Sequence, residues 1–164
     1  MFKLITQATI CLMHVSMMFE FPLKGVIAQS EFSYDKEDEL YLGKPLVDAY
    51  LLQDQVKYYG VVVHNSAEKT IKDYRLRLYP YVNTEVNIDK ARVRHYHLCW
   101  NFLNKDLRED DLTDTCEVWL DTIAERVSGY TRVYIDNTIR IMRQDMDEVN
   151  LLQINLLDRT IEEG

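Results

Sequence analysis

The hydrophobic and polar positions of this chain follow helical spacing first and strand spacing next. Residues 2 to 19 are apolar at intervals of three and four, which predicts a helix. Its repeating apolar positions are Leu4, Ala8, Cys11, Val15 and Met18. Because many of its other positions are apolar as well, we expect this helix to be buried on most of its faces. Pro22 ends it, and residues 23 to 33 then alternate as a strand does.

A charged stretch separates this strand from the next predicted helix. Residues 35 to 39 are all charged, so we expect a solvated loop there. Gly43 and Pro45 then open a helix over residues 44 to 55, because a proline in the first helical turn gives up no backbone hydrogen bond. A strand, a loop and a glycine-led helix can place backbone N–H groups where a phosphate binds, although an ordinary connection has the same pattern.

The middle of the chain predicts one more strand and one more helix. Residues 58 to 63 form a short continuous apolar run, which is typical of a strand covered on both faces. Asn65 can cap the helix that follows, with Glu68 three residues on as its capping partner. Residues 79 to 90 carry a proline, two asparagines and an aspartate, so we expect mainly loop there.

Residues 92 to 102 alternate strongly and predict a strand. One face carries Arg92, Arg94, Tyr96, Leu98, Trp100 and Phe102, and the other carries Val93, His95, His97, Cys99 and Asn101. A helix over residues 113 to 127 ends at Gly129, and a second helix covers residues 131 to 146. The tail from Asn150 is too apolar to remain free in water and should pack. Together these elements predict an α/β (α+β) fold, a mixed sheet of three or four strands with helices mainly on one face.

Length and charge narrow the class of protein. The chain has 164 residues, enough for a single domain with a real core, and we treat residues 1 to 164 as that domain. It is 47% hydrophobic and 28% charged, a globular composition. The 27 acidic against 19 basic residues give a net charge of -8, which argues against a general nucleic-acid binder. No apolar run is long and clean enough to predict a membrane partner.

The cysteines indicate the compartment. Cys11, Cys99 and Cys116 are scattered and form no CxxC pair, so they predict neither a zinc site nor a disulfide framework. We interpret all three as reduced thiols in the core, which favours a cytoplasmic location. The first 21 residues share an early Lys3 and an apolar middle with export signals, but several polar residues interrupt them, so cytoplasm remains the preferred interpretation.

One stretch, residues 24 to 55, carries a resemblance to a known family. It has a basic residue with glycine at a strand start, a glutamate near the strand end, and a glycine that opens a helix. The matching positions are Lys24, Gly25, Glu31, Gly43 and Ala49, and Ser30 departs by standing where the family usually has glycine. The string resembles the C-terminal portion of a class III nucleotidyl cyclase homology domain, over about residues 1 to 141. Among its variants it is most similar to the bacterial pyrimidine (uridylate/cytidylate) cyclases of anti-phage defence.

The resemblance implies definite positions for the family's functional residues. Its two metal-binding aspartates lie on strands before the helix that matches residues 2 to 19, so the ligands of the expected Mg²⁺ or Mn²⁺ are not found in this chain. Its transition-state asparagine and arginine lie four and eight residues after the helix glycine, where this chain has Val47 and Leu51. Neither side chain can donate a hydrogen bond to a phosphate. The aspartate that reads a purine base is replaced by Leu40, with Glu39 one residue away.

A few residues remain as candidates for a site. Lys24, Lys44 and Asp48 are the nucleotide-binding candidates, and no catalytic residue is assigned. His95 and His97 share a strand face as metal ligands can, but no third ligand is visible, so we assign no metal site. The helical segment 136 to 138, Asp-Asn-Thr, is similar to a motif of the pyrimidine-cyclase-like proteins and is interpreted as structural.

Two functions follow from these observations. The first is a nucleotidyl cyclase of the pyrimidine type, a lyase that converts a nucleoside triphosphate to a 3′,5′-cyclic nucleotide and pyrophosphate, inactive as this isolated chain. The alternative is a catalytically silent cyclase-homology module that binds a partner or a nucleotide. The strands that the resemblance places before this chain would leave an open sheet edge, so we expect a homodimer or a partner chain.

Overall fold

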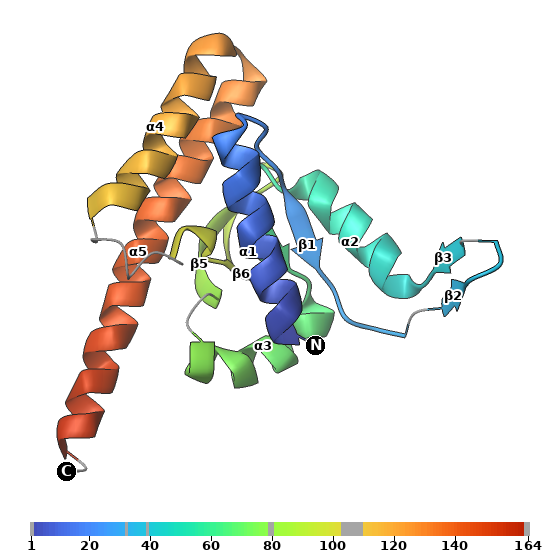
Figure 1. The fold of residues 1–164 in the computed structure, drawn as a ribbon, viewed down its shortest axis with the longest axis horizontal. Helices are drawn as coiled ribbons and strands as arrows, with labels where there is room; N and C mark the ends of the chain where they lie inside the picture. The colour runs from blue at the N-terminus through green and yellow to red at the C-terminus, as the bar shows by residue number, and fades with distance from the viewer. Residues whose placement is uncertain (1, 32, 39, 79–80, 103–109, 163–164) are drawn as a thin grey trace.

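The computed structural model describes residues 2–31, 33–38, 40–78, 81–102 and 110–162 (Figure 1). Its main sheet has four strands in the order β1-β4-β6-β5. β1 (Gly25–Ile27) runs parallel to β4 (Val61–Val63), whereas β4 to β6 (Ala91–Leu98) and β6 to β5 (Tyr81–Ile88) are antiparallel. The α+β class and the mixed sheet are therefore confirmed. β1 and β5 form the two edges of this sheet.

Helices pack on both faces of the sheet, whereas the sequence placed them mainly on one. Ile10 and Met13 of α1 (Phe2–Met18) join a buried cluster with Val61 and Val63, and α3 (Asn65–Leu78) lies on the same face. Leu52 of α2 (Lys44–Gln55) and Ile141 of α5 (Tyr130–Glu162) pack instead around Val62. Successive residues of a strand face opposite sides, so α1 and α2 cover opposite faces of β4. Figure 1 shows α1 crossing the sheet and α2 beside β1.

The remaining helix lies against the others at one end of the molecule. α4 (Asp110–Arg126) contacts α5 and α1, and its buried stripe is Cys116, Leu120 and Ile123. It ends before Gly129, which has a φ of 63° and so takes the left-handed conformation that glycine adopts without strain. The predicted helix over residues 113 to 127 and its stop are confirmed. The predicted charged connection over residues 104 to 111 lies largely outside the described residues.

Residues 79 to 90 were predicted as mainly loop, and this prediction is wrong for Tyr81–Ile88. These residues form β5, which pairs with β6 over eight register positions. Val82, Thr84 and Val86 are buried, at alternate positions of the strand. Asp89, one of the polar residues that suggested a loop, lies in the turn between the two strands, where it takes a positive φ of 47°. The pairing with β6 outweighs the low strand propensity of asparagine and aspartate.

The inner face of α1 also differs from the prediction. Leu4, Val15 and Met18 are 70%, 48% and 60% exposed, and Cys11 is exposed rather than a core thiol. The buried residues are instead Thr6, Ile10, Met13, Ser16 and Met17. Both sets repeat every three or four residues, so their spacing does not distinguish them. The two hydroxyl groups on the buried face form hydrogen bonds within the protein. Thr6 bonds the hydroxyl of Tyr81 at 2.7 Å, and Ser16 donates to the Met13 carbonyl at 2.8 Å.

The predicted strand over residues 23 to 33 is divided. β1 is short, and β2 (Ser33–Asp35) forms a separate hairpin with β3 (Leu40–Leu42) away from the main sheet (Figure 1). The Asp35 carboxylate accepts the backbone N–H groups of Glu37 and Asp38, so the charged turn is held by its own first residue. The last predicted helix and the apolar tail are continuous in α5. Side chains beyond Val149 lie outside the described part.

Candidate functional site

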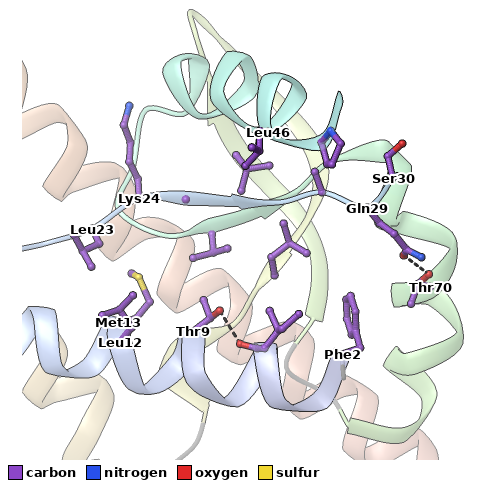
Figure 2. Close-up of a pocket in the computed structure, with 18 residues that line it drawn as sticks. Phe2, Thr9, Leu12, Met13, Leu23, Lys24, Gln29, Ser30, Leu46 and Thr70 are labelled. Carbon is purple, nitrogen blue, oxygen red and sulfur yellow. Dashed lines mark hydrogen bonds between the residues drawn. The ribbon is translucent and has the colours of Figure 1, made fainter. Parts of the chain in front are cut away.

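An apolar cleft of about 810 Å³ lies beside β1 at the open edge of the main sheet. Phe2, Ile5 and Leu12 of α1 form one wall, and Pro45, Leu46 and Ala49 of α2 form the other. β1 lies between them, as Figure 2 shows, with Leu12 and Met13 on the α1 side of the strand and Leu46 on the α2 side. The cleft therefore continues the plane of the sheet between two layers of helices.

The backbone of β1 is paired on one side. The Gly25 N–H donates to the Gly60 carbonyl at 2.9 Å, and the Ile27 carbonyl accepts the His64 N–H at 2.8 Å. Backbone groups of alternate residues in a strand point to opposite neighbours, so the N–H and C=O of Val26 point away from β4 towards the cleft. Within the described part of the chain, β1 pairs with β4 on one side and with no strand on the other.

The three nucleotide-binding candidates are not gathered into one site. Lys24 lines the cleft, but its ammonium donates to the Val56 carbonyl at 3.2 Å and lies 5.4 Å from the centre of the Tyr134 ring. Burial and the neighbouring Lys57 lower the pKa of Lys24. Lys44 and Asp48 form a 4.0 Å pair along α2 and are not part of the cleft lining. Their role in binding a nucleotide stays a prediction.

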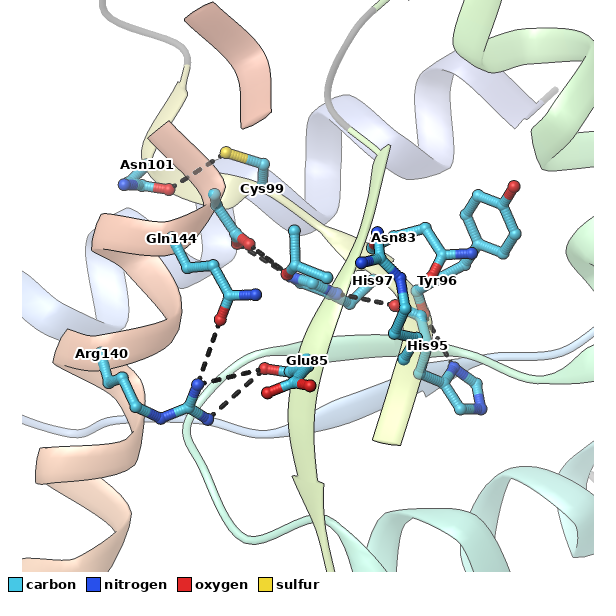
Figure 3. A network of polar contacts seen from close by, with 12 residues as sticks. Asn83, Glu85, His95, Tyr96, His97, Cys99, Asn101, Arg140 and Gln144 are labelled. Carbon is cyan, nitrogen blue, oxygen red and sulfur yellow. Dashed lines mark hydrogen bonds and ion pairs between the residues drawn. The ribbon is translucent and has the colours of Figure 1, made fainter. Parts of the chain in front are cut away.

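A second candidate is a buried polar network between β5, β6 and α5 (Figure 3). His97 Nε2 lies 2.8 Å from both carboxylate oxygens of Asp145, and the Thr84 hydroxyl donates to one of them at 2.8 Å. His97 Nδ1 lies 3.0 Å from the His95 carbonyl oxygen. Both ring nitrogens thus face acceptors, which requires a proton on each. The geometry indicates an imidazolium paired with a carboxylate.

The surroundings of His97 favour its charged form although the side chain is out of water. His97 is 1% and Asp145 3% exposed. Burial alone would lower the pKa of His97, but the charge and hydrogen bonds of Asp145, together with the His95 carbonyl, outweigh it and raise the pKa. Burial and Asp145 also raise the pKa values of Tyr58 and Cys99. The network holds α5 on the sheet, and its three side chains, Thr84, His97 and Asp145, are all buried.

Two further predictions about polar residues can be compared with the structure. Asn137 donates to the Lys57 carbonyl at 2.7 Å, and the Thr138 hydroxyl accepts the Tyr59 N–H at 2.8 Å. The segment 136 to 138 therefore holds α5 against residues 57 to 59, which precede β4, as its structural interpretation predicted. His97 is not free to ligate a metal in this arrangement, because each of its ring nitrogens already lies within hydrogen-bond distance of an oxygen atom of the protein.

The metal ions that the resemblance implies can be tested against the donor set. Among the described residues, no group of three or more His, Cys, Asp or Glu side chains is placed to hold a metal ion. The lining of the cleft also contains no acidic residue. Mg²⁺ and Mn²⁺ prefer oxygen ligands such as carboxylates. The residues of this part of the chain therefore do not fit either ion.

Sequence reasoning missed two features of these sites. The first is the α1 wall of the cleft, whose signal is a second apolar stripe in residues 2 to 19. The second is Asp145, which stands four residues from both Ile141 and Val149. An acidic residue in register with a helical apolar stripe indicates a buried partner, here His97.

Comparisons with known proteins give no relative. No family model matches the chain, and neither the search of curated proteins nor that of solved structures found a similar protein. The resemblance to the cyclase homology domain therefore stays a prediction. In the part of the chain that is described, no helix combines the length and the apolar character that a membrane crossing requires.

Proposed function

We propose that this chain is a catalytically silent cyclase-homology module that binds another protein at the cleft beside β1. The observation that supports it is the cleft itself, apolar on both walls and bordered by an unpaired strand edge. Apolar walls and a free edge favour a polypeptide over a charged nucleotide, whose phosphates need clustered cations or metal. Lys24 is the one cation of the lining, and other groups of the chain already hold it.

The exposed surface supports binding to a partner as well. The accessible surface is 10659 Å², whereas a compact monomer of 19.5 kDa exposes about 8,500 Å². The end of α5 extends beyond the other elements in Figure 1. Exposed apolar side chains near the cleft contribute to this surface: Leu12 and Leu46 line the cleft, and Val15 and Val47 lie outside its lining on the same helices. A standard interface covers about 800 Å² of each partner, so this surplus suffices for one.

A second candidate function is the nucleotidyl cyclase of the pyrimidine type, for which a partner would have to supply the carboxylates that hold Mg²⁺ or Mn²⁺. The order of strand β1, a hairpin and the glycine-led helix α2, with Lys24 beside the cleft, favours it. In both cases the protein would act in the cytoplasm. Free thiols at Cys11, Cys99 and Cys116 suit that reducing compartment.

Site-specific photocrosslinking in the cells that make the protein tests the binding proposal. A photoreactive benzoylphenylalanine replaces Leu46, which lines the cleft, and in a matched control replaces Val47, a somewhat more exposed neighbour outside the lining. We expect a discrete protein adduct at position 46 and little at position 47. Equal labelling at the two positions, or adducts of nucleotide alone, would contradict the proposal.

A further inference from the structure

We infer that the partner enters the cleft as an extended, almost wholly apolar strand of a different polypeptide, which pairs with β1 and adds a fifth strand to the sheet. This inference rests on the proposed function, because it names the form of the partner that the cleft binds. Four features of the described residues carry it: the direction of the Val26 backbone, the spacing of the walls, their chemistry, and the placement of the chain's own strands.

The backbone of Val26 presents one donor and one acceptor to the cleft. Gly25 and Ile27 use their polar groups on β4, so an incoming strand can pair with Val26 without breaking any bond of the sheet. Buried backbone groups are almost always paired, and the walls of this cleft offer few polar atoms that could pair with them. An extended main chain supplies both partners at the required spacing.

The position of the two walls selects a strand over a helix. α1 covers one face of β1 and α2 the other, so the space beside β1 is one layer deep. A neighbouring strand lies about 4.8 Å from β1, whereas a helix with its side chains is about 10 Å across. A strand in this place points its side chains alternately towards Leu12 of α1 and Leu46 of α2.

The chemistry of the walls specifies the side chains of that strand. Ile5 and Leu12 on one side and Leu46 and Ala49 on the other are apolar, so residues of both orientations meet apolar surface. Strands that are covered on both faces are nearly continuous runs of valine, isoleucine and leucine. The partner segment is therefore apolar at consecutive positions rather than at alternate ones.

A second copy of this chain does not supply such a strand. Its β1 lies between its own α1 and α2, and its other edge strand, β5, interrupts its apolar residues with Asn83, Glu85 and Asn87. Outside the main sheet, β2 (Ser33–Asp35) is fully exposed and carries serine and aspartate. The described strands whose side chains are placed thus offer no free apolar segment, which favours a donor from another polypeptide.

A synthetic peptide tests the inference. The probe is an acetylated peptide with a central Val-Ile-Val-Val-Ile-Val run flanked by solubilising residues, and its control has two consecutive N-methylated residues at the centre. N-methylation removes donors from both edges while keeping the side chains. We expect the probe to bind the full chain and to slow hydrogen exchange of the Val26 amide at least about tenfold, and the N-methylated peptide to do neither.

Variants of the walls connect this binding to the cleft. Leu46→Arg and Leu12→Arg should each weaken binding about tenfold or more, whereas Val47→Arg and Val15→Arg, on the same helices outside the lining, should leave it unchanged. Val26→Pro removes the edge donor but no bond to β4 and should abolish binding. Circular dichroism of each variant checks that it folds.

Several results would overturn the inference. No binding of the probe at millimolar concentration, equal binding of the N-methylated peptide, or an unprotected Val26 amide would each show that the occupant is not a strand. Concentration-dependent protection of Val26 in the protein alone, with a doubled mass by light scattering, would assign the cleft to a second copy. A protein adduct at position 46 in the crosslinking experiment would still support the proposed function in the first three cases.

Discussion

At the scale of single residues, the buried ion pair between His97 and Asp145 is the most strongly determined arrangement in the molecule. The two side chains come from β6 and α5, and Thr84 of β5 completes the set. A buried carboxylate costs much free energy unless it is paired and hydrogen-bonded. Here the His95 carbonyl and the Asp145 carboxylate lie within hydrogen-bond distance of the two ring nitrogens of His97. Removing one partner therefore leaves a buried polar group of another unpaired.

Removing the carboxylate should therefore destabilise the fold strongly. Asp145→Ala leaves His97 buried without its partner, and breaking a buried pair in this way costs about 3–5 kcal/mol. Urea denaturation of the variant and the wild type measures the difference. Glu117→Ala, which breaks the exposed pair with Arg143, is the control and should change the free energy of unfolding little. Equal effects of the two substitutions would mean that the buried pair is not formed.

The same pair predicts a pH dependence of stability. The folded pKa of His97 is raised above its unfolded value of about 6.5, so the folded state binds the proton more tightly than the unfolded state does. The stabilisation is complete below that unfolded value and is lost as the pH rises through the folded pKa. Urea titrations from acid to alkaline pH should show this fall in the wild type, and His97→Gln should lack that component. An identical pH profile in the variant would assign the fall to other groups.

At the scale of elements, α1 shows how one helix can carry two stripes of equal spacing. Ile10, Met13 and Met17 face the sheet, while Leu4, Val15 and Met18 face outwards. The spacing of apolar residues shows that a helix has an apolar side. In a helix as apolar as α1, the spacing fits more than one such side. The sheet selects the stripe whose two polar members can be hydrogen-bonded, because Thr6 finds Tyr81 and Ser16 finds the Met13 carbonyl.

Two methionines of α1 give a matched test of this orientation. Met13 is 2% exposed and Met18 is 60% exposed. Met13→Ala should lower the free energy of unfolding by about 2–5 kcal/mol, because it leaves a cavity in the core. Met18→Ala should change it by less than about 0.5 kcal/mol, as surface substitutions usually do. A larger loss at Met18 than at Met13 in urea titrations would reverse the orientation of the helix.

At the scale of the whole molecule, the described sheet has two edges, β1 and β5, and the apolar cleft lies beside β1. Helices cover both faces, so the free edge lies at the base of a cleft rather than on a flat surface. Natural proteins cover or block open edges because these invite pairing with other chains. An edge lined by apolar walls is therefore the place where we propose that another chain pairs.

The isolated chain should have no cyclase activity. Val47 and Leu51 stand where the resemblance requires an asparagine and an arginine, and both are exposed on α2 with no donor group. The described residues also offer no acidic cluster for a metal ion. Incubation with each of the four ribonucleoside triphosphates and Mn²⁺, followed by mass spectrometry, measures this directly. Cyclic nucleotide above an enzyme-free control would disprove silence and favour the second candidate function.

The sequence by itself determined the elements whose signals are local. Pro45 and Gly43 placed the start of α2 and Gly129 the break between α4 and α5, because backbone conformation acts within a few residues. α3 does begin at Asn65, but the N–H groups of Ser66 and Ala67 bond to His64 rather than to Asn65. Alternation placed β6 as far as Leu98, whereas Trp100–Phe102, predicted as part of the same strand, form a short 3-10 helix. These features need no knowledge of what the segment packs against.

Only the tertiary structure decided which surfaces are inside. β5 exists because β6 pairs with all of it, the inner face of α1 follows from the position of Tyr81, and Asp145 is buried because His97 is there to meet it. The cleft likewise arises from three segments, α1, β1 and α2, that meet only in the fold. Burial and pairing depend on contacts between distant residues, and no local pattern records which of two equivalent stripes or edges will find a partner.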